Sequence, residues 1–181
     1  MSLTITYFVH GTTTDNERDI ATGQAHGELS ELGKKQAKEL GRMIAKMRFD
    51  AVFCSDLKRA ADSAKLMFGK RYEVIHDRRL RECHYGTFTG HPDAEFKPEM
   101  HKYITKPFPK GESYKDVERR VVDLLAFLKE HYKEGRVAVV GHQAPQLALE
   151  VLTKGKTWKR AMDEDWRKTK AWQSGWEYVV K

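Results

Sequence analysis

Apolar residues gather in short stretches that are separated by segments with helical periodicity. Residues 3–9 (LTITYFV) first alternate polar and apolar positions and then become uniformly apolar, as a buried strand does. Residues 51–55, 136–140 and 176–180 predict three more strands, and residues 73–75 predict a weaker one. Strands of this length, spread along the whole chain, indicate a sheet whose members are joined by longer connections.

The connections between these strands carry apolar positions every three or four residues, which predicts amphipathic helices. One helix is expected from Ser30 as its N-cap to about residue 47, and a second from Asp56 as its cap to residue 68. A third opens with a capping-box-like pair, Ser113 and Asp116, and Pro145 suits the first turn of a fourth. Strands that alternate with helices predict an α/β fold of three layers, with a mostly parallel central sheet and helices on both faces.

Residues 83–111 differ from the rest of the chain and are expected to form a loop or lid. Four of the five prolines lie between residues 80 and 111, where little periodicity remains. Connections of this length inside a compact domain are usually functional. Two interpretations of the lid's lysines stay open, attraction of an acidic substrate or a solvated rim, and these lysines are Lys97, Lys102, Lys106 and Lys110.

Length and composition narrow the class of protein. Residues 1–181 are expected to form a single domain, and the net charge of +7 comes from 33 basic residues interspersed with 26 acidic ones. Because no long basic block occurs, we expect no nucleic-acid partner. No apolar stretch has the length of a membrane span, so no membrane partner is expected either. With only Cys54 and Cys83, the chain has no disulfide framework, and a cytoplasmic location is predicted.

Two histidines follow the most apolar strands. His10 precedes Gly11, and His142 comes directly after Gly141. By itself, His10 is as compatible with a satisfied strand-end residue as with a catalytic one. If both strands are central and parallel, however, their carboxyl ends lie at one edge of the sheet, and the two imidazoles meet there. Three more histidines lie in the lid at spacings that fit no familiar ligand pattern, so no metal site is expected.

Other polar groups are expected at the same edge. Arg59 lies in the first turn of a helix, where free N–H groups favour an anion. Glu82 lies at the entrance to the lid, and Asn16 lies in the loop after the first strand. Together with two imidazoles, these groups suit phosphoryl transfer through a nucleophilic histidine. A neutral ring nitrogen attacks phosphorus, donors hold the equatorial oxygens, and an acid protonates the leaving oxygen.

Several segments, in this order, resemble those of the histidine phosphatase superfamily, also called phosphoglycerate-mutase-like. Residues 9–16 (VHGTTTDN) are similar to that family's Arg-His-Gly opening with its following asparagine. The other segments that resemble the family are residues 21–23 (ATG), 28–37 (ELSELGKKQA), 54–60 (CSDLKRA), 80–86 (LRECHYG), 111–113 (GES) and 139–142 (VVGH).

The resemblance implies a metal-independent phosphatase that hydrolyses a phosphate monoester of a small substrate and needs no cofactor. It makes His10 the nucleophile that forms a phosphohistidine, and Glu82 the proton donor and later the base. The residues that it assigns to catalysis are His10, Glu82, His142 and Arg59. Those that it assigns to phosphate or substrate binding are Gly11, Asn16, Thr13, Thr22, Gly23 and Gln143.

The chain departs from the family's pattern at three positions. Val9 stands where the family has an arginine, Gln143 stands where it has a glycine, and Thr12 replaces an acidic or amide residue. Valine cannot donate a hydrogen bond to phosphate, and this leaves three explanations. The substrate carries less charge, the domain binds phosphate esters without turning them over, or another cation fills the gap, with Arg18, Arg79 and Arg81 as candidates.

Two alternatives to a phosphatase remain at this stage, a non-catalytic phosphate-ester-binding or interaction domain and a phosphoglycerate-type mutase. A mutase is disfavoured because residues 86–110 are too few for the insertions that mutases carry. A homodimer is a possible assembly. The tail holds four tryptophans, which are expected to be packing residues, with Trp158 and Trp166 as candidates for lining a pocket.

Overall fold

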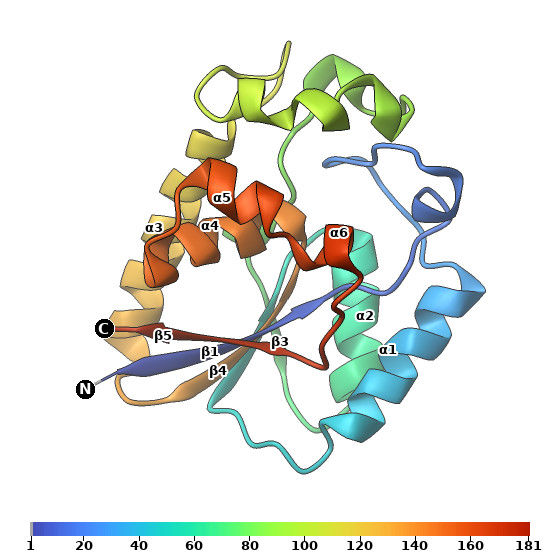
Figure 1. Cartoon of the computed structure of the whole chain (residues 1–181). Coiled ribbons are helices and arrows are strands. Elements are labelled where there is room, and N and C mark those ends of the chain that lie inside the picture. Colours follow the sequence, from blue (N-terminus) through green and yellow to red (C-terminus); the bar gives the residue numbers. More distant parts are fainter. Residues whose placement is uncertain (1) are drawn as a thin grey trace.

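Residues 2–181 are described by a computed structural model in which one five-stranded sheet has the order β3-β2-β4-β1-β5 (Figure 1). In its interior, β1 (Leu3–Val9) and β4 (Arg136–Gly141) are parallel neighbours. On the far side of β4, β2 (Ala51–Cys54) and β3 (Val74–His76) continue the parallel arrangement. At the other edge, β5 (Trp176–Val180) runs antiparallel to β1, which makes the sheet mostly parallel, as predicted.

Helices cover both faces of this sheet. On one face, α1 (Glu31–Met43) and α2 (Lys58–Phe68) pack against a core that includes Phe8. On the other face, α3 (Tyr114–His131), α4 (Gln143–Lys154) and α5 (Trp158–Asp163) share a larger core that includes Tyr7. Consecutive residues of β1 enter opposite cores because side chains alternate along a strand. The predicted three-layer α/β fold is confirmed. No helix within residues 2–181 has both the length and the apolar character that crossing a bilayer requires.

Two predicted helix boundaries are wrong, each for a local reason. The first helix ends at Met43 rather than near residue 47, because tight turns take over from Ile44, whose N–H still bonds to Leu40. The second helix begins at Lys58 without a side-chain cap. Asp56 does not cap it, because its carboxylate is engaged by the guanidinium of Arg81 at 2.6 and 2.7 Å.

The predicted caps at Ser30 and Ser113 are confirmed. Ser30 Oγ accepts a hydrogen bond from Gly33 N at 3.1 Å. Ser113 and Asp116 form a complete capping box at the start of α3. Pro145 lies in the first turn of α4, as expected.

The lid, residues 83–111, is a packed segment with short 3₁₀ helices at Gly86–Phe88, Asp93–Glu95 and Lys97–Tyr103. It lies above the carboxyl ends of the central strands in Figure 1, where it is drawn in green. Its aromatic residues pack on one another as part of the larger core, and the rings of Tyr103 and Phe108 stack with their centroids 3.9 Å apart. Gly86 has a φ of +56°, and a Cβ there would lie 1.9 Å from the Pro109 carbonyl oxygen. The two ends of the lid, near Gly86 and Pro109, therefore pack closely against each other.

Candidate active site

A cleft of about 270 Å³ lies at the carboxyl ends of β1 and β4, with lid residues along one wall. It contains the two imidazoles whose meeting the sequence predicts. The ring centroids of His10 and His142 lie 5.0 Å apart, with the planes tilted by 58°. Most of the predicted site residues line this cleft, namely His10, Asn16, Thr22, Gly23, Arg59, Glu82, His142 and Gln143.

His10 is held in the tautomer that a nucleophile needs. Its Nδ1 donates to the carbonyl oxygen of Gly11 at 2.7 Å, and because a carbonyl only accepts, the proton must be on Nδ1. Nε2 then carries the free lone pair. Burial, together with the positive charge of Arg59, lowers the pKa of His10 to about 3. The imidazole is therefore neutral at physiological pH and able to attack phosphorus.

His142 is fixed through its backbone while its ring stays free. The Tyr7 hydroxyl donates to the His142 carbonyl at 2.8 Å and accepts from the His142 N–H at 2.7 Å. Burial raises the pKa of Tyr7 far above its ordinary value, so this hydroxyl keeps its proton. A Cβ at Gly141 would lie 2.2 Å from the Tyr7 oxygen, which explains the glycine before His142.

The His142 ring is buried, and neither of its nitrogens has a hydrogen-bond partner within the described chain. Burial and the charge of Arg59 lower the pKa of His142 well below its ordinary value. Buried polar atoms without partners are rare, and they call for an explanation. An anion in the cleft would supply the missing partner for the ring N–H.

Arg59 provides a buried cation from the first turn of α2, with 2% of its surface exposed. Its guanidinium donates to the carbonyl oxygens of Gly23 at 2.6 Å and Ala25 at 3.2 Å. Arginine has five N–H donors, so three are left without a partner within residues 2–181. The first loop therefore orients Arg59 and leaves the rest of its donors available to an anion.

Asn16, Thr22 and Gly23 are brought to the cleft by the same loop. Asn16 Oδ1 accepts from the N–H of Thr13 at 3.0 Å, which leaves the side-chain NH₂ available as a donor. The Thr22 hydroxyl donates to Asp15 at 2.9 Å, and Gly23 offers its carbonyl to Arg59.

The structure does not bring two of the predicted phosphate contacts, Gly11 and Thr13, to the cleft. The Gly11 N–H is committed to the Ser63 hydroxyl at 3.0 Å, and Thr13 is fully buried behind Asn16, where its hydroxyl accepts from the Asn16 N–H. Both residues build the loop instead. Gly11 is required by close packing, because a Cβ there would lie 2.3 Å from the Gly33 oxygen.

The Glu82 carboxylate lies at the start of α4, next to the backbone that follows His142. It accepts backbone hydrogen bonds from Cys83 at 2.8 Å, Ala144 at 3.0 Å and Gln143 at 3.1 Å. Two of these donors are the first N–H groups of α4, which have no partner inside the helix. With 7% of its surface exposed, Glu82 is held in a fixed position in the lining of the cleft.

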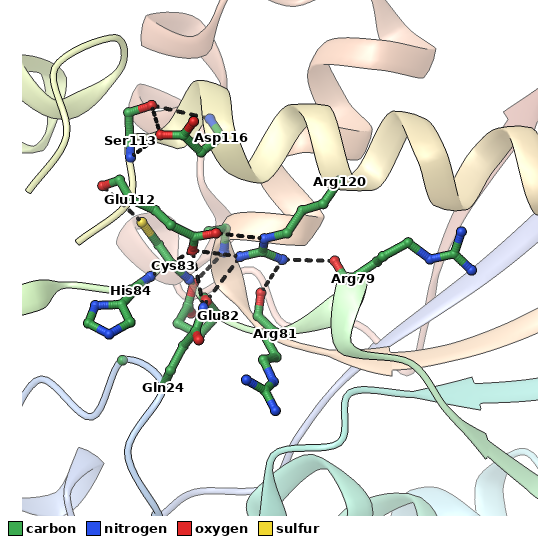
Figure 2. Close-up of polar contacts among 12 residues, drawn as sticks. Gln24, Arg79, Arg81, Glu82, Cys83, His84, Glu112, Ser113, Asp116 and Arg120 are labelled. Atoms are coloured by element: carbon green, nitrogen blue, oxygen red, sulfur yellow. Dashed lines mark hydrogen bonds and ion pairs between the residues drawn. The ribbon is translucent and has the colours of Figure 1, made fainter.

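A second arginine, Arg120 of α3, holds the backbone of the segment that contains Glu82. Figure 2 shows its guanidinium between the carboxylate of Glu112 and the backbone of the Glu82 segment. Both oxygens of Glu112 accept from it at 3.1 Å. It also donates to three carbonyl oxygens, those of Arg79 at 2.8 Å, Arg81 at 2.7 Å and Glu82 at 3.0 Å. We call this arrangement the Arg120–Glu112 clasp.

The clasp also joins the first loop and the lid to the site. Glu112 Oε2 accepts from the His84 N–H at 2.9 Å and from the Gln24 side chain at 3.1 Å. Gln24 in turn donates to the Glu82 carbonyl at 3.0 Å (Figure 2). No sequence pattern singled out Arg120 or Gln24, because their roles depend on contacts between segments that are far apart along the chain.

None of the three arginines suggested as substitutes for the family's first arginine reaches the cleft. Arg18 is 67% exposed and bonds to Asp15. Arg79 and Arg81 are paired with Asp77 and Asp56, and they line a different hollow. That part of the prediction is wrong.

The tail places a different cation at the site. Arg167, in the short helix α6 (Trp166–Thr169), lines the cleft together with Trp166, as the sequence suggests for this tryptophan. Lys97 of the lid also lines the cleft, and it is ion-paired with Asp93. Trp158, in contrast, is a packing residue of the core.

Among residues 2–181, no three His, Cys, Asp or Glu side chains are grouped so that they could hold a metal ion. The lid histidines have other partners. His91 and His101 pair with Glu95 and Asp163, and His84 Nδ1 accepts from the Gly86 N–H.

The sequence matches a known family over most of its length. Residues 7–171 match the family model of the histidine phosphatase superfamily, branch 1. Fructose-2,6-bisphosphatase TIGAR of Xenopus tropicalis is 36% identical over 134 residues, which cover 68% of this chain and 49% of that protein. The metal-independent phosphoserine phosphatase of Arabidopsis thaliana is 36% identical over 146 residues, which cover 74% of this chain and 61% of that protein. The chain thus spans between about half and three fifths of the length of these relatives.

Solved structures agree. The mycobacterial glucosyl-3-phosphoglycerate phosphatase superposes with a TM-score of 0.78 at 27% identity, covering 90% of this chain and 84% of that chain. Bacillus stearothermophilus YhfR has the same TM-score at 22% identity, covering 88% and 83%, and it supports the fold alone. With its sequence match, its sheet order and its paired strand-end histidines, the chain belongs to the histidine phosphatase superfamily.

Proposed function

We propose that this protein is a phosphatase that hydrolyses a phosphate monoester through a phosphohistidine on His10. The observation that carries the proposal is the His10 ring, whose Nδ1–H donates to Gly11, which leaves the Nε2 lone pair free in a cleft that His142 also lines. A neutral, oriented imidazole is what in-line attack on phosphorus needs. The relatives from Xenopus tropicalis and Arabidopsis thaliana, a fructose-2,6-bisphosphatase and a phosphoserine phosphatase, support the same proposal.

The first half-reaction forms the phosphoenzyme. The Nε2 lone pair of His10 attacks phosphorus, and the bond between phosphorus and the leaving oxygen breaks. Arg59, His142 and the Asn16 side chain stabilise the charge on the equatorial oxygens. Protonated Glu82 transfers its proton to the leaving oxygen and becomes a carboxylate.

The second half-reaction releases inorganic phosphate. The Glu82 carboxylate takes a proton from a water molecule, whose oxygen attacks phosphorus. The bond between phosphorus and Nε2 breaks, and the pair of electrons returns to His10. Both residues are then restored, with no metal or organic cofactor in either step. The name of the Arabidopsis relative, a metal-independent phosphoserine phosphatase, supports that feature.

Phosphate release from p-nitrophenyl phosphate, phosphoserine and 3-phosphoglycerate tests the proposal, with EDTA present throughout. We expect turnover in the wild type, none in His10→Ala and a loss of at least a hundredfold in Glu82→Gln. His131→Ala is the matched control, because that histidine is exposed at the end of α3, and it should keep full activity. Equal background rates in wild type and His10→Ala would refute the phosphatase.

Two further measurements, of phosphoglycerate interconversion and of phosphate binding, separate the two alternatives. Some relatives are mutases, such as the 2,3-bisphosphoglycerate-dependent phosphoglycerate mutase of Methylorubrum populi, which is 30% identical over 167 residues. Interconversion of 2- and 3-phosphoglycerate without phosphate release would favour a mutase. Binding of phosphate with neither reaction would favour a non-catalytic domain.

A further inference from the structure

The position of the family's first arginine is occupied here by a side chain without a donor. Val9 lines the catalytic cleft and also a second, more apolar cavity of about 630 Å³ next to α1. Trp166 and His10 line both cavities as well. The chain therefore has no cation at the carboxyl end of β1. There, Val9 and the part of the C-terminal tail that follows α5 form the wall of the cleft.

The same part of the tail brings a guanidinium into the cleft. Arg167 donates to Asp165 Oδ1 at 3.0 Å and to Gln146 Oε1 at 3.1 Å. Of its five N–H donors, three have no partner among residues 2–181. Its side chain is 26% exposed, as expected for a group at the edge of an open cleft.

We propose that Arg167 is the second phosphate-binding cation of this site and that it replaces the arginine missing at position 9. Its free N–H groups bind the phosphoryl oxygens of the substrate, together with Arg59. As far as it concerns turnover, this inference rests on the proposed function, but phosphate binding tests it independently.

Gln143, which stands in place of the family's glycine, connects this tail to the centre of the site. Its side chain donates to Asp165 Oδ2 at 2.5 Å, and its backbone N–H donates to Glu82 at 3.1 Å. Asp165 is 4% exposed and accepts from both Gln143 and Arg167. Two departures from the family's pattern are thus linked, since Val9 removes one cation and Gln143 helps to hold its replacement.

Aromatic packing holds α6 against the body of the protein. The Trp166 indole donates to Gln146 at 3.1 Å and stacks on Trp176 with ring centroids 5.0 Å apart. The guanidinium of Arg167 lies over the Trp166 ring, 4.4 Å from its centroid. Arg167 is therefore held from two sides before any ligand binds, which lowers the entropy that binding would cost.

The charges around the cleft support the assignment. Among the described residues, Arg59, Lys97 and Arg167 are the only Lys or Arg side chains that line it. Lys97 is ion-paired with Asp93 and Arg167 with Asp165, but the Arg167 guanidinium keeps three N–H donors without a partner in this part of the chain. The charge of Arg167 contributes to the lowered pKa values of both His10 and His142, so its field extends to the reacting centre. Without Arg167, a phosphate dianion would meet Arg59 as the only guanidinium among the described residues that line the cleft.

Calorimetric titration with inorganic phosphate and with orthovanadate tests this role without requiring turnover. Arg167→Gln should weaken both affinities by about ten- to a hundredfold, the effect of losing one charge-assisted contact. Arg160→Gln is the matched control, because Arg160 is exposed on α5 and pairs with Glu164, and it should bind like the wild type. Val9→Arg should raise the affinity for phosphate at least tenfold when it is added to Arg167→Gln, but less than threefold when it is made alone in the wild type.

A wild-type measurement guards against misfolding of these variants. Phenylglyoxal modifies free guanidinium groups, and mass spectrometry locates the label. Saturating phosphate should protect Arg167 and leave the labelling of Arg160 unchanged. The inference is overturned by equal labelling of Arg167 with and without phosphate, by Arg167→Gln binding within threefold of wild type, or by a tenfold gain from Val9→Arg alone.

The outcomes also separate this inference from the proposed function. Phosphate binding that depends on Arg167, without turnover of any ester, would refute the phosphatase and support the inference. Turnover that depends on His10, with phosphate binding unaffected by Arg167→Gln, would support the phosphatase and refute the inference. Absence of phosphate binding in the wild type would overturn the inference.

Discussion

Replacing Arg120 by methionine should reduce both stability and catalysis, because the clasp holds the segment that carries Glu82. Methionine keeps much of the apolar length of the side chain but removes all five hydrogen bonds of the guanidinium. Glu112 then keeps its negative charge without its only ion-pair partner within residues 2–181. The Arg120 side chain is 16% exposed and the Glu112 side chain 25%, so water can solvate the unpaired Glu112 carboxylate in part.

The size of the effect follows from these contacts. Breaking a buried ion pair by removing one partner costs about 3–5 kcal/mol, and partial exposure places this pair near the lower end, at about 3 kcal/mol. For a chain of this length, each kcal/mol shifts Tm by about 2–4 °C, so Tm should fall by about 6–12 °C. A displacement of Glu82 by about 1 Å is expected to lower kcat by about a hundredfold.

Differential scanning fluorimetry and p-nitrophenyl phosphate turnover, measured well below Tm, would check both parts. Arg119→Met is the control, because this neighbour is 77% exposed and pairs only with Asp116 among the described residues, so it should change Tm by less than about 2 °C. Adding Glu112→Gln to Arg120→Met should recover part of the stability, since it removes the unpaired charge. A Tm within about 2 °C of wild type in Arg120→Met, with unchanged kcat, would refute the reasoning.

Three further predictions concern the two histidines and the first loop. Tyr7→Phe should lower kcat more than tenfold with little change in KM, because the His142 backbone loses both bonds to the hydroxyl; an unchanged kcat in steady-state assays would contradict this. Thermal melts from pH 7 to pH 4 should show that the wild type loses stability as the pH falls. In the unfolded chain His10 takes up a proton near its ordinary pKa of 6.5, whereas in the native protein, where its pKa is about 3, it stays neutral over this range, so acid favours the unfolded state. That loss should be smaller in His10→Asn, and equal slopes would rule out this origin. Gly33→Ala should lower Tm by more than 5 °C, because its Cβ would lie 1.9 Å from the Thr12 carbonyl oxygen; a melt that matches wild type would disprove the steric argument.

Much of the fold could be predicted because local rules determine it. The apolar pattern along β1 predicts a buried strand, the helical stripes give each helix one face that packs on the sheet, and both predicted serine caps are confirmed. The site could be predicted where it depends on strand ends. His10 and His142 leave parallel neighbouring strands at the same edge, and the pairing of Val9 with Gly141 brings them together.

The sequence by itself therefore determined the layers, the paired imidazoles and the helix turn that carries Arg59. Only the tertiary structure decided which cations line the cleft with Val9, what holds Glu82, and that the N–H of Gly11 is already committed. Strand and helix patterns record which face of an element is buried, and this can be read from neighbouring residues. A guanidinium at the end of a flexible chain is placed by partners far away in the sequence, as Arg120 is by residues 79–82 and Arg167 is by Gln146. No local pattern records those partners, because they exist only once the chain has folded.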